Sequence, residues 1–319
     1  MIGYFPKIVP PMFKIFEKTK TGGDKVNDNL IEVSLIVLWS CLFKKIPAFL
    51  TPNLSEVLQL IFESDLVSSN IRSSAIKVIV DYVDSKTLLL TICSLYPHVS
   101  QLDASSIGLY VLALEMIIES LDKKTAVKQA NVFVRFLLQA LEYRAISKFD
   151  NNTIHRIEAS IYNCAIQYVM KLNDKSFRPL FASVCRWAFD GEGSVTSIDE
   201  IDRMKSFFKF FNKLQESLRS IITSYYSYLL DSTEELLNKF ADGSIKDINL
   251  RRLVLISLTA SFKSDQDEYW QSQARYETIV NALTSQFANV EDGIGKYLVK
   301  AVTSLVQDTS SSDEKILGC

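Results

Sequence analysis

Apolar residues along this 319-residue chain recur with the 3.6-residue period of an α-helix in one segment after another. No segment alternates apolar and polar residues with a period of two over a convincing length, so no strand is predicted. The loops between the apolar rows are short, and about a dozen consecutive helices favour bundles or an α-solenoid. The predicted helices cover residues 29–46, 54–64, 70–83, 103–121, 125–146, 153–172, 177–189, 198–230, 233–240, 250–262, 268–287 and 294–306.

Two of these helices begin alike. Asn70-Ile71-Arg72 and Asn249-Leu250-Arg251 each place a capping residue, an aliphatic residue and an arginine before an apolar run, a pattern similar to the second helix of a HEAT repeat. A solenoid repeats helix pairs, and each pair buries its apolar face against the next. We therefore expect an all-α, divergent HEAT-type α-solenoid of stacked antiparallel helix pairs, its divergence marked by the long segment 198–230.

Composition agrees with a helical core. Hydrophobic residues make up 48% of the chain and charged residues 23%, so the chain can bury a large core and is not disordered. Glycine and proline are scarce, which excludes collagen-like and low-complexity classes and argues against an all-β fold. A net charge of -2 provides no global basic field, so any nucleic-acid binding must be local.

Cysteine spacing and apolar runs bear on the compartment. The five cysteines are scattered and form no C-x-x-C pair, which predicts buried free thiols in a reducing compartment. The longest apolar run, 33–43, is too short to span a bilayer, and residues 1–7 lack the pattern of a signal peptide. We expect a soluble intracellular protein with no membrane partner.

The most informative segment is residues 171–188. Ser176 is predicted to cap a helix that carries Pro179 in its first turn, where a missing N–H is tolerated. Phe177, Leu180 and Phe181 fall on one face and are predicted to be core, whereas the Arg178 side chain is predicted to project from the other side of the helix. Trp187 flanks the core face.

This stretch resembles the signature of the C-terminal domain of a large nucleolar HEAT-repeat family, called HEAT-repeat-containing protein one in animals and the tenth U-three-snoRNA-associated protein in fungi. Segments 133–144, 203–208 and 275–277 resemble further helices of the same domain. The resemblance covers roughly residues 120 to 308 and implies a chain that is a fragment of a longer polypeptide. Three parts are expected: N-terminal HEAT-like helices over 1–119, the family domain over 120–308 and a flexible tail over 309–319.

The resemblance implies a non-enzymatic scaffold of the small-subunit processome in the nucleolus. It would act with other proteins of the early U-three snoRNP subcomplex in transcription of pre-rRNA and in processing toward 18S rRNA. The resemblance also implies the leading spacer of pre-rRNA as a further partner. The signature residues Ser176 to Phe181 and Trp187 are expected to be structural.

Candidate chemistry is sparse. The sequence has two histidines, His98 and His155, far apart, and neither a G-x-S-x-G nor an H-E-x-x-H motif. An all-α enzyme would need convergent carboxylates or a metal, and no such set is found in the sequence. We therefore expect no catalytic residue, no cofactor, no metal and no small-molecule substrate.

One local charge pattern suggests a partner. Lys205, Lys209 and Lys213 recur every four residues beside a run of phenylalanines, either as a stripe for RNA phosphate or as the solvated face of an amphipathic helix. Arg251 and Arg252 carry the same ambiguity. A different class of function, a transport-receptor-like α-solenoid that binds a protein cargo, would be favoured by regular pairs of about forty residues and an acidic inner surface.

Overall fold

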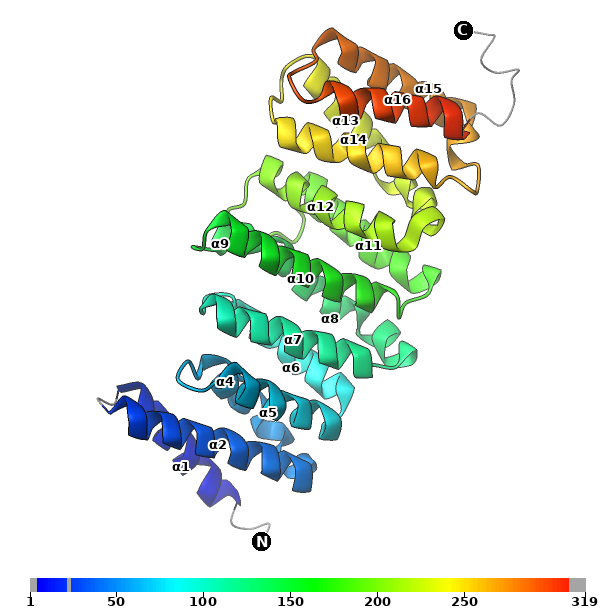
Figure 1. Ribbon diagram of the computed structural model, residues 1–319. Coiled ribbons are helices and arrows are strands. Elements are labelled where there is room, and N and C mark those ends of the chain that lie inside the picture. Colours follow the sequence, from blue (N-terminus) through cyan, green and yellow to red (C-terminus); the bar gives the residue numbers. More distant parts are fainter. Residues whose placement is uncertain (1–4, 22–23, 310–319) are drawn as a thin grey trace. The chain divides into compact units, whose positions relative to one another are not determined.

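The computed structural model describes residues 5–21 and 24–309, and within these ranges the chain is helical with no strand (Figure 1). The all-α fold is therefore confirmed. Residues 1–177 and 178–319 form two compact units, and the division between them falls inside one helix. The expected tail lies, apart from Thr309, outside the described residues.

The first unit consists of two layers of helices. Helices α2, α5, α7 and α10 pack side by side in sequence order and form one layer (Figure 1). The other layer contains α1, α4, α6 and α8, and each of its members pairs with a helix of the first layer. The first layer spans Lys25–Lys45, Ser69–Tyr82, Ala104–Ser120 and Asn151–Val169, and the second Phe5–Thr21, Leu54–Glu63, Ser85–Val99 and Lys123–Leu141. Short elements α3 (Pro47–Leu50), η2 (Thr51–Asn53) and α9 (Tyr143–Ile146) make the connections.

The second unit repeats this arrangement. Helices α12 (Glu200–Leu218), α14 (Ile248–Lys263) and α16 (Gly295–Thr309) pack in one layer, with α14 in the middle. The 3-10 helix η3 (Arg219–Tyr228), α13 (Leu230–Ala241) and α15 (Gln273–Ser285) cover them. Two 3-10 turns, η4 (Tyr269–Gln271) and η5 (Gln286–Ala288), flank α15, and α11 (Asp174–Asp190) contributes its residues from Arg178 onward.

Aromatic side chains fill the space between the layers. In the second unit Phe181 is fully buried, and its ring lies 5.5 Å from Phe211 and 5.3 Å from Tyr225, measured between centroids. In the first unit Tyr96 packs edge-on against Phe136 at 5.2 Å. Such pairs add to the stabilisation that burial of the rings already provides.

Aspartate begins most of the long helices. Asp84 shows the pattern: its carboxylate accepts hydrogen bonds from the Thr87 N–H at 2.9 Å and from the Thr87 hydroxyl at 2.8 Å. These bonds satisfy donors that the first turn leaves without a partner. The same role is filled by Asp24, Asp103, Asp122, Asp150, Asp199 and Asp247.

The expected helix over 198–230 is wrong in its second half. Helix α12 ends at Leu218, and Arg219 adopts a φ of 49°, a conformation that costs a non-glycine residue about 1–3 kcal/mol. The chain then turns into η3, which packs back on α12 and brings Tyr225 against Phe181. A continuous helix would carry Tyr225 away from that ring, so tertiary packing overrides the local helical pattern.

Two long helices, α1 and α6, are absent from the predicted set. Both contain proline inside the helix, Pro10 and Pro11 in α1 and Pro97 in α6. Proline removes a helical hydrogen bond and normally ends a helix, so the local signal argues against these segments. Packing of α6 against α7 and α8 stabilises it nevertheless.

The HEAT-like arginine of the first unit links three helices. Arg72 is the fourth residue of α5 and is 3% exposed. Its guanidinium donates to the Phe62 carbonyl in α4 at 3.3 Å and to the Ser105 hydroxyl in α7 at 3.4 Å. Asn70, expected as the cap, is instead the second helical residue, because α5 begins at Ser69.

Replacement of Phe181 by alanine is expected to destabilise the second unit by about 3–5 kcal/mol, since it removes a buried ring from an aromatic cluster and leaves a cavity. Phe287→Ala is the matched control, because Phe287 is 51% exposed and should change stability by no more than about 0.5 kcal/mol. Urea unfolding followed by circular dichroism measures both. An unchanged midpoint for Phe181→Ala would contradict a core role.

The hydrogen bonds from Thr87 lower the pKa of Asp84 below its ordinary value. A carboxyl group whose pKa is lowered by folding stabilises the protein above its unfolded pKa and loses that contribution as the pH falls through the folded pKa. Asp84→Ala should therefore cost roughly 1 kcal/mol at neutral pH, and the difference from wild type should shrink below about pH 4.

Asp84→Asn is the control for this cap, because the amide oxygen still accepts from Thr87 but does not titrate. Its stability relative to Asp84→Ala should stay constant with pH. A gap between wild type and Asp84→Ala that is equally constant would show that the charge contributes nothing to the cap.

Candidate interaction surfaces

The lysine row of α12 lies along the seam with α14. The ammonium group of Lys205 is 2.6 Å from Oδ1 of Asp202 and 3.1 Å from Oδ2 of Asp247, the residue that caps α14. Further along the same seam, Asn212 donates to the Leu253 carbonyl at 3.2 Å. The first lysine of the row therefore joins two helices.

The other two lysines differ in exposure. Lys209 is half-buried, whereas Lys213 is exposed and its ammonium group is 2.7 Å from Oε2 of Glu216. The expectation that all three project from one exposed face is therefore corrected for Lys205 and Lys209. The row stays a candidate contact only through Lys213 and the exposed parts of the other two side chains.

The surroundings of Lys205 keep it charged. Burial alone would lower the pKa of Lys205, but the hydrogen bonds and charges of Asp202 and Asp247 outweigh burial and raise that pKa above its ordinary value. A partly buried ion pair of this kind stabilises the packing of the two helices more than an exposed pair would. Its lysine is also less available to bind an external polyanion.

Arg251 and Arg252 are neighbours with opposite environments. Arg251 is 2% exposed, and its guanidinium donates to the Gln286 carbonyl at 3.1 Å and to the Asn289 carbonyl at 2.7 Å. Burial lowers the pKa of Arg251, while nearby Glu291 opposes that shift. The candidate contact is therefore wrong for Arg251, which fixes the connection between α15 and α16, and stays open for the exposed Arg252.

Arg251 and Arg72 occupy the same position in their helices. Each is the fourth residue of its helix, is buried, and donates to groups on neighbouring helices or their connections. The likeness between the two segments thus has a structural basis. Asn249, like Asn70, is the second helical residue and not the cap, which is Asp247.

The signature helix α11 is capped one turn earlier than expected. The Ser176 N–H donates to Oδ1 of Asn173 at 2.9 Å, and the Asn173 N–H donates to the Ser176 hydroxyl at 3.1 Å. This reciprocal pair is a capping box in which Asn173 is the cap and Ser176 its partner. Pro179 consequently lies in the helix interior and not in its first turn.

The core face of α11 is as expected. Phe177, Leu180, Phe181 and Trp187 are buried, with exposed fractions of 5% or less. Arg178 is exposed, and its guanidinium carbon lies 5.4 Å from the centre of the Tyr225 ring. A cation above an aromatic face is an attractive arrangement that covers the buried ring from the solvent side.

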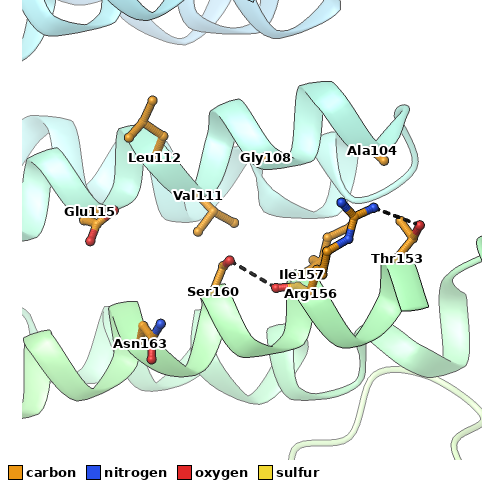
Figure 2. Close-up of a pocket in the computed structure, with 10 residues that line it drawn as sticks. All are labelled: Ala104, Gly108, Val111, Leu112, Glu115, Thr153, Arg156, Ile157, Ser160 and Asn163. Carbon is orange, nitrogen blue, oxygen red and sulfur yellow. Dashed lines mark hydrogen bonds between the residues drawn. The ribbon is translucent and has the colours of Figure 1, made fainter. Parts of the chain in front are cut away.

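A groove of about 320 Å³ lies between α7 and α10 (Figure 2). Gly108 and Leu112 line it from α7, and Arg156 extends from α10 toward α7 beside Thr153, to whose hydroxyl it donates at 3.3 Å. The Ser160 hydroxyl donates to the Arg156 carbonyl at 3.1 Å. The Thr153 hydroxyl in turn donates to Oδ2 of Asp150 at 2.7 Å.

Histidines and cysteines form no chemical site in the described part of the chain. His98 is 2.6 Å from Oε1 of Glu63 and His155 is 3.6 Å from Oε2 of Glu158, and both histidines are exposed. No group of three His, Cys, Asp or Glu residues that could hold a metal ion is found in these ranges. Cys93, Cys164 and Cys185 are buried free thiols, whereas Cys41 is exposed.

Helix α2 is long and apolar enough to cross a membrane by length and composition, and is the one such helix among those described. Its Ile36, Trp39 and Phe43 side chains are fully buried within the first unit. These three side chains pack α2 into the first unit, although only 28% of its apolar stretch is buried. The opposite side of α2 exposes Val26 and Leu30.

A basic stripe on α8 is not among the features predicted from the sequence. Lys124, Lys128 and Arg135 are all exposed, and their spacing of i, i+4 and i+11 places them on one side of the helix. The signal was present in the sequence, because the segment 123–141 contains no carboxylate.

Fold and family match together define the class of this protein. Residues 125–270 match the BP28CT (NUC211) domain, and the match includes the signature helix and α12. The described chain is thus all-α, and its residues 125–270 are similar to the BP28CT domain.

The particular likeness is to U3 small nucleolar RNA-associated protein 10. The Candida albicans relative is 50% identical over 320 residues, the Scheffersomyces stipitis relative 49% over 321, and the Saccharomyces cerevisiae relative 45% over 316. Each comparison covers 98% of this chain and 18% of the relative, so the chain spans under a fifth of the curated relatives that it matches. The resemblance expected from the signature residues is confirmed.

The two neighbouring arginines give a direct test of the assignments above. Arg251→Met should destabilise the second unit by at least about 2 kcal/mol, because it leaves two carbonyl groups without their donors. Arg252→Met removes the same charge from the surface and should change stability by no more than about 0.5 kcal/mol. Urea unfolding of both variants is the measurement, and equal effects would refute the structural role of Arg251.

Proposed function

We propose that this chain is a non-enzymatic scaffold segment of the U3 snoRNP within the small-subunit processome. It acts in the nucleolus, in transcription of pre-rRNA and its processing toward 18S rRNA, by holding proteins of the early subcomplex. Contact with the leading spacer of pre-rRNA belongs to the same proposal.

The observation that carries this proposal is the similarity to proteins named U3 small nucleolar RNA-associated protein 10, at 45–50% identity over 98% of the chain. Identity at this level along nearly the whole chain supports a shared fold and a shared set of exposed surfaces. Because the chain corresponds to 18% of those proteins, it is proposed to supply part of their binding surface.

The structure supports a binding role by its architecture. Stacked helix pairs offer exposed ridges that suit protein contacts, and the described residues hold no metal-ligating cluster. Within the second unit, the ion pair between Lys205 and Asp247 and the hydrogen bonds of Arg251 hold neighbouring helices together. Rigid presentation lowers the entropy lost when a partner binds.

The test is a chimera in Saccharomyces cerevisiae, in which this chain replaces the matching segment of the tagged relative. We expect affinity purification to recover U3 snoRNA, and the strain to maintain its ratio of 18S to 25S rRNA. A matched chimera that carries Phe181→Ala should lose both, since the segment no longer folds stably. The Phe287→Ala chimera should behave as the unmodified one.

Two outcomes would overturn the proposal. Purification of a stable chimera without U3 snoRNA would separate this segment from the snoRNP. Recovery of a protein cargo in place of snoRNP components, released by a nuclear-transport factor, would favour the transport-receptor alternative.

A further inference from the structure

Helix α8 is unusual in its charge. It contains four cations, Lys123, Lys124, Lys128 and Arg135, and no carboxylate among its 19 residues. Its neighbour α6, on which it packs, likewise contains no carboxylate within Ser85–Val99 and adds Lys86. Two adjacent helices therefore present an acid-free outer face in a chain whose net charge is -2.

The cations of α8 are arranged for a linear ligand. Lys124, Lys128, Asn131 and Arg135 fall within an arc of about 60° and extend over roughly 16 Å at 1.5 Å per residue. All four side chains are exposed, while Phe133, on the opposite side of the helix, is fully buried. We call Lys124, Lys128 and Arg135 the α8 stripe.

The α8 stripe is not neutralised by its surroundings. Within the described residues none of its three cations forms an ion pair, whereas Lys205, Lys213 and other surface cations do. The carboxylates nearest to the stripe in the sequence are Asp122, the cap of α8, together with the exposed Glu119 and the buried Glu142. Asp122 is engaged by Thr125, whose N–H and hydroxyl donate at 2.9 and 2.6 Å, and Asp84 is engaged by Thr87.

The character of the stripe favours a phosphate backbone over an acidic protein. Protein interfaces usually centre on a buried aromatic or large apolar anchor. The apolar side chain beside the stripe is Val127, which is 37% exposed, and α8 exposes no aromatic ring. The absence of an exposed ring on this helix also removes a platform for base stacking, which leaves electrostatic contact with phosphates.

We propose that the α8 stripe binds the phosphate backbone of RNA without reading its bases. The choice of RNA as the polyanion rests on the proposed function above. Binding is then local, independent of sequence and strongly dependent on salt, because each neutralised phosphate releases a condensed counterion.

The test is a salt titration with a single-stranded oligouridylate and the whole chain, followed by fluorescence anisotropy. Replacement of all three residues, Lys124→Gln, Lys128→Gln and Arg135→Gln, should weaken binding and reduce the slope of log K against log salt by up to about two, at 0.7 per phosphate. A cytidine-containing oligonucleotide of equal length should bind wild type with the same affinity, since no base is read.

Two controls isolate the stripe. Lys20→Gln, Lys239→Gln and Arg186→Gln together remove the same charge from cations that already have acidic partners, and should leave the slope nearly unchanged. Lys124→Arg with Lys128→Arg retains the charge and should retain binding. Circular dichroism of each variant confirms folding, because exposed substitutions change stability by about 0.5 kcal/mol or less.

An equal loss of slope in the stripe variant and the charge-matched control would overturn the proposal in favour of net charge. If oligouridylate binding is unchanged in the stripe variant while binding of polyglutamate is lost, the ligand is an acidic protein and the proposal also fails. These readouts use the isolated chain, so they can fail while the chimera still recovers U3 snoRNA. Conversely, a chimera without U3 snoRNA leaves the phosphate-binding result intact.

Discussion

No helix pair in this chain closes a core by itself, and the remaining features of the structure depend on that constraint. Helix α7 packs against α5 before it and α10 after it within its own layer, and against α6 in the other layer. Helix α14 has the same position between α12 and α16. Because each central helix is buried on several sides, its stability comes from neighbours, and stacking is the way in which this sequence can bury its apolar surface.

Stacking also explains the use of charge. Lys205 joins α12 to the cap of α14, Arg72 joins α4, α5 and α7, and Arg251 fixes the connection that leads to α16. Each of these cations bonds polar groups of neighbouring helices or of their connections. The cations that remain for an external ligand are those that do not link helices in this way. The α8 stripe is a set of such cations.

The proposed scaffold function depends on the same division between groups used within the fold and groups left exposed. A stacked fold fills the space between its layers with side chains, such as the rings around Phe181. Such a segment contributes to an assembly by position, and similarity to a portion of much longer relatives agrees with that role.

The sequence by itself determined most helices and the core face of α11. Apolar periodicity is a local property, so it located α5, α7, α10 and α14 to within a few residues and placed Phe177, Leu180 and Phe181 in the core. The aspartate caps, with threonine or serine three residues later, are equally local and could have sharpened the helix starts.

Tertiary structure decided the features that depend on residues far apart in the chain. The break at Arg219 exists because Tyr225 packs on Phe181, and α6 persists despite Pro97 because α7 and α8 hold it. The candidate site depended on the same distinction. Periodicity shows which side of a helix carries Lys205 or Lys128, but whether that lysine meets Asp247 or solvent depends on the neighbouring helix, which the local pattern does not specify.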